Sequence, residues 1–311
     1  VLSVRPGFYL SQNGLDIENG NKIFPFGGIS KKITVYCNES GEYAIYPSDR
    51  YGFNNPDLAW DKEQIKWLLI GDSFVQGACV SQGNDIAGKI RSLTEEPTIN
   101  LGIGGAGPLI ELAILKEYAK FKKPKKVIWV YYEQNDLVNN LALEKESPLL
   151  FKYLQDDFSQ DLLNKQQEID TALRRFVKNS ESKKYSQIFL LTSIRQLINF
   201  SNDVYIDPLF FQILLKAKNQ VELWGGRFYF VYLPEFSRYA TQVDNHDQYR
   251  KRSTIISMVK DLDIPVIDIH KKVFKKHKDP MSLFPLKIHG HYTVEGYEKI
   301  AKSIISSINN Q

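Results

Sequence analysis

The feature that most constrains the fold is a repeated alternation of short apolar runs with stretches of helical periodicity, which begins near residue 65. Continuous apolar runs, unlike strictly alternating ones, are typical of strands that are covered on both faces. Repeated strand–helix units predict a parallel sheet with right-handed crossovers. The expected strands lie at residues 65–70, 97–101, 126–132, 227–233 and 265–269.

These strands predict an α/β domain over residues 65–311, with a flavodoxin-like, three-layer α/β/α arrangement around a parallel five-stranded sheet. Residues 1–64 differ, because short alternating runs are separated there by turn signals. We expect a β-rich segment packed on the α/β domain. The connection between the third and fourth strands is far longer than a crossover needs. It predicts a helical insertion at about 137–225, serving as a packing element, a lid over the strand ends or a docking surface.

Composition excludes several classes of protein. Hydrophobic residues make up 43% of the chain and charged residues 24%, as in ordinary globular domains. The net charge of +4 is spread along the sequence and does not favour nucleic acid as a partner. No apolar run approaches the roughly 20 residues that cross a bilayer. The chain begins at Val1, so we expect that a signal peptide or membrane anchor could precede it.

Polar or glycine-rich segments follow four of the expected strands. Ser73 follows the first, the glycine-rich turn 102–107 the second, Asn135 the third, and His291 precedes the last helix. Ligands bind beyond the carboxyl ends of parallel strands. A serine, a histidine and well-placed N–H donors are the parts of an acyl-transfer site. Each of these residues alone has an ordinary structural explanation. Only their combination indicates an acyl-transfer site.

Two other kinds of site are suggested by parts of the sequence. The turn 102–107 partly matches the G-x-G-x-x-G pattern of dinucleotide sites, so a nucleotide-binding protein is an alternative. His246 with Asp244 and Asp247 lacks a convincing metal-ligand spacing. Two cysteines, Cys37 and Cys79, cannot make a zinc site by themselves and are either free thiols or one disulfide. We therefore predict neither a metal nor a cofactor.

The order and spacing of the four segments resemble the SGNH, or GDSL, hydrolase superfamily over most of the chain. Ser73 stands in Gly-Asp-Ser, Asn135 in Gln-Asn-Asp, and His291 before Tyr-Thr. The resemblance implies that Ser73, adjacent to Asp72, is the nucleophile and His291 its general base. It also implies an oxyanion hole formed by Ser73, Gly105 and Asn135.

The sequence departs from the family pattern at the position that usually holds an aspartate three residues before the histidine. Here that position is Ile288, so either a Ser–His dyad operates or another carboxylate supports the base. Glu133 and Asp279 are the candidates for this acid. Glu133 could equally bind a substrate hydroxyl or form a salt bridge, and His289 could compete with His291 as the base.

The resemblance implies a serine esterase that removes a small acyl group, such as acetyl, from a carbohydrate. An O-acyltransferase and a catalytically silent carbohydrate-binding relative are alternatives. The segment 49–55 also resembles members linked to bacterial glycan modification. The superfamily resemblance favours the periplasm or cell envelope over the cytoplasm, and in an exported protein Cys37 and Cys79 could pair. No oligomeric state is predicted.

Overall fold

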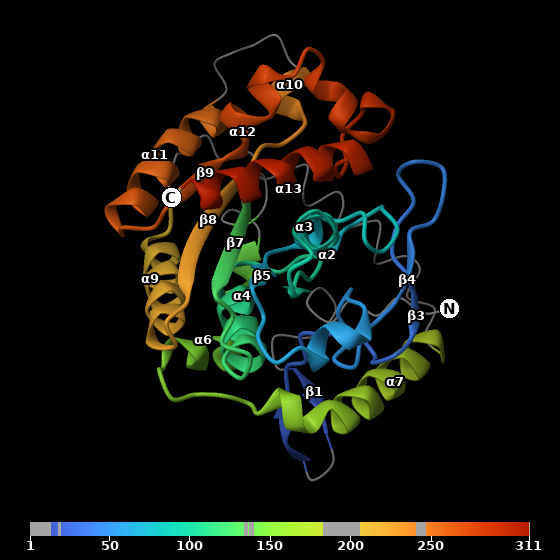
Figure 1. The fold of residues 1–311 in the computed structure, drawn as a ribbon. Helices are drawn as coiled ribbons and strands as arrows, with labels where there is room; N and C mark the ends of the chain where they lie inside the picture. The colour runs from blue at the N-terminus through green and yellow to red at the C-terminus, as the bar shows by residue number, and fades with distance from the viewer. Residues whose placement is uncertain are drawn as a thin grey trace.

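A fully parallel, five-stranded sheet forms the centre of the molecule (Figure 1). The computed structural model describes residues 14–17, 20–133, 136, 140–182, 206–240 and 247–310. The strands are β5 (Trp67–Ile70), β6 (Thr98–Asn100), β7 (Lys126–Tyr132), β8 (Arg227–Leu233) and β9 (Val266–Asp268). They lie in the order β6-β5-β7-β8-β9, which confirms the predicted α/β fold.

The first strand of the sheet, β5, lies between β6 and β7. The chain therefore winds away from β5 in both directions, and β5 sits at the switch point of the topology. Loops that leave neighbouring strands diverge at such a point and open a crevice beyond the carboxyl ends of the strands. The residues that follow β5 and β6 are thus placed where a ligand can bind.

Helices cover both faces of the sheet. One face packs against α3 (Ile86–Thr94) and α13 (Val294–Asn309). The other packs against α4 (Pro108–Ile114), α9 (Pro208–Leu223) and α11 (Asp247–Asp261). Successive side chains of β7 point alternately into these two layers, and both layers are buried. This is why the strand sequences are continuously apolar.

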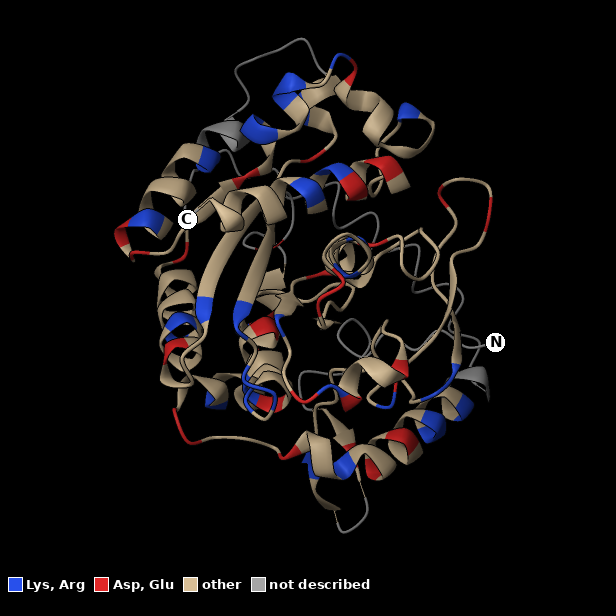
Figure 2. Ribbon diagram, in the orientation of Figure 1, with Lys and Arg blue, Asp and Glu red and all other residues tan. Residues whose placement is uncertain are grey.

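The remaining helices are short, apart from one. They are η2 (Asp57–Asp61), α2 (Ser73–Gln76), η3 (Leu115–Ala119), α5 (Leu141–Glu144), α6 (Pro148–Phe151), η5 (Lys152–Leu154), η6 (Leu162–Lys165), the long α7 (Gln166–Ser182), α10 (Ser237–Ala240), α12 (Ile269–Lys272), η8 (Phe274–Lys276), η9 (Pro280–Leu283) and η10 (Pro285–Lys287). Figure 2 shows that basic and acidic residues are interspersed over the helices, as they are along the sequence.

The amino-terminal segment is β-rich, as expected. It contains two antiparallel pairs, β1 (Leu15–Asp16) with β2 (Lys22–Ile23), and β3 (Ile33–Val35) with β4 (Ile45–Pro47). The β3–β4 hairpin packs on the core through Tyr36 and Tyr46, which are 6% and 2% exposed. Gln76 of α2 donates to the hydroxyl of Tyr46 over 2.9 Å, so the hairpin is tied to the helix that follows β5.

The described parts of the connection between β7 and β8 contain helices joined by turns and irregular segments, such as residues 155–161. Its last helix, α9, packs on β8 and α4 and therefore belongs to the layers of the core rather than to an insertion. The helix α7 lies against the amino-terminal segment, where Asp170 accepts from the hydroxyl of Ser30 over 2.5 Å. The side-chain amide of Gln160 likewise accepts from the Phe24 backbone N–H over 2.8 Å. These contacts fit a packing role for residues 148–182.

Among the described residues, no helix is both long enough and apolar enough to span a membrane.

Candidate active site

Ser73 is presented at the carboxyl end of β5 by a tight strand-to-helix turn. A side chain at Gly71 would approach the carbonyl oxygen of Val130 to 2.8 Å, so only glycine fits there. Asp72 caps the following helix, because its Oδ1 accepts from the backbone N–H of Phe74 over 2.9 Å. The turn leaves Ser73 partly exposed, while its neighbours Asp72 and Phe74 are buried.

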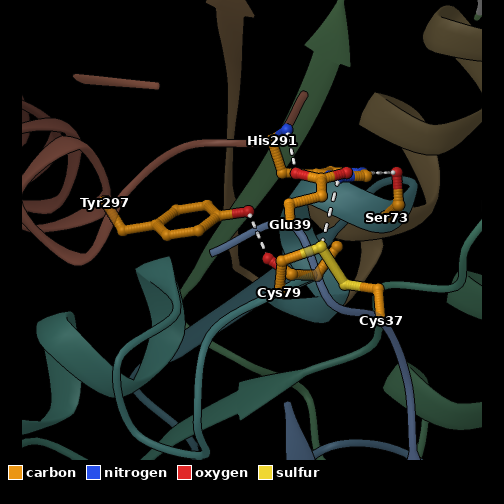
Figure 3. Close-up of a disulfide and its surroundings, with 7 residues drawn as sticks. Cys37, Glu39, Ser73, Cys79, His291 and Tyr297 are labelled. Carbon is orange, nitrogen blue, oxygen red and sulfur yellow. Dashed lines mark hydrogen bonds and ion pairs between the residues drawn. A yellow bond between two sulfur atoms is a disulfide. The ribbon is translucent and has the colours of Figure 1, made fainter. Parts of the chain in front are cut away.

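His291 lies beside Ser73, although the two residues are far apart in the sequence. Its Nε2 is 2.8 Å from the Ser73 Oγ (Figure 3). The imidazole also packs against the ring of Phe74, with 4.6 Å between the ring centroids. Thr293 caps α13 by accepting from the Gly296 N–H over 3.1 Å, and this cap fixes the loop that carries His291.

The carboxylate beside His291 belongs to Glu39, in the loop between β3 and β4. Its Oε1 lies 2.8 Å from the His291 Nδ1, and its Oε2 accepts from the His291 backbone N–H over 2.7 Å. A carboxylate at Nδ1 places the ring proton there, which leaves Nε2 free to accept the proton of Ser73. Burial raises the pKa of Glu39, but the hydrogen bonds and charge of His291 outweigh burial. The pKa of Glu39 is thus lowered, which favours the carboxylate.

Glu39, His291 and Ser73 therefore form one continuous chain of hydrogen bonds. The side chains of Glu39 and His291 are 29% and 22% exposed, so the site is open to a substrate. In this arrangement the carboxylate orients the imidazole and stabilises its protonated form, and the imidazole removes the proton of the serine. Chemically, the arrangement can generate a serine nucleophile.

Backbone N–H groups for an oxyanion are available next to Ser73. The turn that follows β6 packs against α2, with the Gly104 N–H donating to the Gln76 side chain over 2.7 Å. Gly105 has a positive φ of 79° and is partly exposed. Among the described residues, no acceptor is found for the N–H groups of Gly105 and Ser73. With respect to the described residues, both N–H groups are thus available to a negative oxygen.

The segment that follows β7 stabilises the glycine-rich turn after β6 through hydrogen bonds. Glu144 is buried, and its carboxylate accepts from the N–H of Gly107 over 2.6 Å and from that of Leu109 over 2.8 Å. Burial raises the pKa of Glu144 to about 8, although these hydrogen bonds oppose the rise. Asn140 donates to the carbonyl of Ala106 over 2.9 Å. The conformation of the turn thus depends on residues outside it.

The structure places the two acids proposed from the sequence elsewhere. Both oxygens of Glu133 are engaged by Arg238, and the hydroxyl of Tyr232 also donates to Glu133 over 2.6 Å. This is the salt-bridge alternative for Glu133. Asp279 pairs with Lys287 at 2.6 Å. The acid that sequence reasoning missed is Glu39.

The other predicted site residues are placed as follows. Asn135 lies outside the described residues. His289 is exposed, and its ring centroid is 6.4 Å from that of Phe236. Asp72 acts locally as the helix cap. The structure therefore brings Ser73, Gly105 and His291 to one end of the sheet.

Cys37 and Cys79 form a disulfide next to these residues. The Cys79 Sγ lies 3.8 Å from the His291 Nδ1. In the described part of the chain, the one group of side chains with metal-ligand proximity is Glu39, Cys79 and His291, whose ligand atoms all lie within 4.8 Å of one another. The Cys79 sulfur is already bonded, and Glu39 and His291 bind each other, so these residues do not fit a metal ion.

A buried pair of acids lies in the core near the turn. Glu111 and Asp136 are almost fully buried, and neither oxygen of Glu111 has a hydrogen-bond partner among the described residues. Burial and the charges of Asp136 and Asp72 raise the pKa of Glu111 well above its usual value. Burial and the charge of Asp72 also raise the pKa of Asp136. The raised pKa of Glu111 favours its neutral form.

Comparison with known proteins finds similarity only at the level of structure. No family model and no curated protein match the sequence. A lipase/acylhydrolase from Enterococcus faecalis is 13% identical, with a TM-score of 0.47, covering 79% of this chain and 96% of its own. A lipolytic G-D-S-L family member from Veillonella parvula is 11% identical (TM-score 0.46; coverage 79% and 100%). A catalytic mutant of an acetylxylan esterase from Geobacillus stearothermophilus is also 11% identical (TM-score 0.43; coverage 78% and 94%).

Proposed function

We propose that the protein is a serine ester hydrolase in which Ser73 is the nucleophile, His291 the general base and Glu39 the orienting acid. The observation that carries this proposal is the hydrogen-bonded chain from the Glu39 carboxylate through both nitrogens of His291 to the Ser73 Oγ. A binding protein would have no need of a base aligned on a partly exposed serine.

The reaction proceeds in two halves. Ser73 Oγ forms a bond to the ester carbonyl carbon as His291 Nε2 takes its proton, and the carbonyl oxygen becomes an oxyanion held by the N–H groups of Ser73 and Gly105. The bond to the alkoxide then breaks as His291 returns the proton to the leaving oxygen. Water attacks the acyl-serine by the same route, which releases the acid and restores Ser73.

We further propose that the substrate is a small acyl ester, such as acetyl, on a glycan. Tyr43 supports this proposal, because it lies on the same loop as Glu39 and is 66% exposed. An exposed aromatic ring offers an apolar face with a polar edge, which suits stacking against a sugar. The disulfide supports a place outside the cytoplasm, in the bacterial periplasm or cell envelope, because disulfides persist in oxidising compartments.

Hydrolysis of p-nitrophenyl acetate tests the nucleophile and the base. We expect Ser73→Ala and His291→Ala each to lower kcat/KM by about 10⁴-fold or more, because the two residues act as one unit. Far-UV circular dichroism verifies that the variants fold. Full activity in Ser73→Ala would refute the proposal.

The proposed substrate is tested with an O-acetylated oligosaccharide and its deacetylated form as the control. Acetate release is measured for the wild type and for Tyr43→Ala. We expect Tyr43→Ala to raise KM on the oligosaccharide and to leave p-nitrophenyl acetate hydrolysis unchanged. Acetylation of an added sugar acceptor, in place of acetate release, would show that the site works as an O-acyltransferase.

A further inference from the structure

The orienting acid and the nucleophile are joined covalently through a disulfide. Cys37 lies two residues before Glu39, and Cys79 lies six residues after Ser73. The Cα atoms of the two cysteines are 5.1 Å apart. Figure 3 shows the disulfide directly beside the row formed by Glu39, His291 and Ser73. The bond thus fastens the loop that carries the acid to the segment that carries the serine.

Few other contacts hold the tip of this loop. Its base is closed by backbone hydrogen bonds of 2.9 Å and 2.8 Å that join Ala44 to Tyr36 and Cys37. Beyond that point residues 38 and 40–43 are exposed, and β3 and β4 pair over three residues only. The tip itself is held by the disulfide and by the two hydrogen bonds from Glu39 to His291. Partly exposed ionic hydrogen bonds alone are weak, because ordering the loop and the side chain costs conformational entropy.

We propose that the Cys37–Cys79 disulfide is a positioning element for Glu39, so that the Glu39–His291–Ser73 chain assembles fully only in the oxidised protein. This inference rests on the proposed esterase function. Ser73 is placed by β5 and α2, and His291 by the loop that the Thr293 cap fixes, and the hydrogen bonds that form these elements do not involve either cysteine. Loss of the bond should therefore uncouple the acid and leave the serine and the histidine in place.

A phosphine reductant provides the first test on the wild-type protein. The phosphine gives two electrons to the disulfide and takes an oxygen atom from water, and the two protons of that water complete the two thiols. EDTA is present so that the freed thiols cannot capture a metal ion. We expect kcat/KM for p-nitrophenyl acetate to fall by about tenfold or more, because activity scales with the fraction of molecules in which Glu39 is docked. The matched control is Cys37→Ser/Cys79→Ser, which has low activity from the start and does not respond to the phosphine.

A mutant cycle separates positioning from general structural damage. The variants are Glu39→Gln, Cys37→Ser/Cys79→Ser and the triple variant, each checked by circular dichroism. If the disulfide acts through Glu39, the triple variant is no less active than Glu39→Gln. In all three variants the loss falls on kcat rather than on KM, because the acid acts on the base and not on the bound ester.

Two outcomes overturn the inference. Either the reduced protein retains the kcat and KM of the oxidised protein, or the losses from the cysteine and glutamate substitutions multiply in the triple variant. Failure of the proposed function looks different, because the oxidised wild type would then neither hydrolyse the ester nor react with a fluorophosphonate at Ser73.

Discussion

At the scale of single residues, the distinctive feature of the site is that its acid comes from the amino-terminal hairpin. The position at which the resemblance seen in the sequence would place the acid is Ile288, which is 56% exposed here. Glu39 reaches both the ring and the backbone N–H of His291. One carboxylate thus contacts both the imidazole and the backbone of the residue that carries it.

Gly290 makes room for this carboxylate. A Cβ built there would lie 2.7 Å from the Glu39 Oε2, so alanine must push the carboxylate away. We expect Gly290→Ala to lower kcat/KM toward the level of Glu39→Gln, a loss of about 10²–10⁴-fold, with little change in stability. Ester hydrolysis and thermal unfolding measure the two effects.

The control for this prediction is Gly290→Ala in a Glu39→Ala background. With the carboxylate removed, the new methyl group displaces nothing, so the double variant should match Glu39→Ala. A further loss in the double variant would show that Gly290 acts by some other route.

At the scale of elements, the hairpin depends on a buried carboxylate at its base. Asp49 is fully buried, and its oxygens accept from the backbone N–H groups of Tyr51 and Phe53 and from the side chains of Asn55 and Trp60. Burial raises the pKa of Asp49 to about 6, against the effect of these four donors. The side chain organises the segment that leads from β4 to the sheet.

We expect Asp49→Asn to lower the free energy of unfolding by about 2–4 kcal/mol, because an amide NH₂ would then face donors that have no other acceptor. Urea denaturation measures the effect, and Asp61→Asn on the exposed end of η2 is the control. A change below about 0.5 kcal/mol, which is typical of surface substitutions, would contradict this account.

The elements that were predictable from the sequence are those set by local pattern. Continuous apolar runs marked the five strands, and Thr293 marked the start of α13. The acid was not predictable, because Glu39 sits in an exposed, turn-rich loop and is brought to His291 only by tertiary structure. The cysteines held the one available signal: a bond between Cys37 and Cys79 places Glu39 beside the end of α2. The bounds of the insertion stay a prediction, since an amphipathic pattern does not distinguish a helix such as α9, which packs on the sheet, from added helices.

At the scale of the whole molecule, the buried acids make stability depend on pH. In Glu111 and Asp136 the folded pKa lies above the unfolded value, so the native state keeps protons that the unfolded chain releases. Stability therefore falls as pH rises above the unfolded pKa, which is about 4.3 for glutamate. Glu144 adds to this fall up to its own pKa of about 8.

We expect Glu111→Met to flatten this dependence. Its oxygens have no partner among the described residues, so an apolar side chain of similar volume removes the cost of a buried acid. The variant should be more stable than the wild type at pH 8 by about 1–4 kcal/mol, with a smaller difference at pH 5. Denaturant unfolding at the two pH values measures this. An equal effect at both values would mean that Glu111 does not change its protonation on unfolding.

The central claim is that Glu39 and His291 activate Ser73, and the most direct test is the rate of Ser73 labelling by a fluorophosphonate in the oxidised protein. Mass spectrometry locates the adduct, and the wild type is compared with Glu39→Gln. We expect a single adduct on Ser73 that forms at least about tenfold more slowly in Glu39→Gln, because the base is no longer oriented. Labelling at the same rate in both proteins, or no adduct on Ser73 in the wild type, would contradict the account.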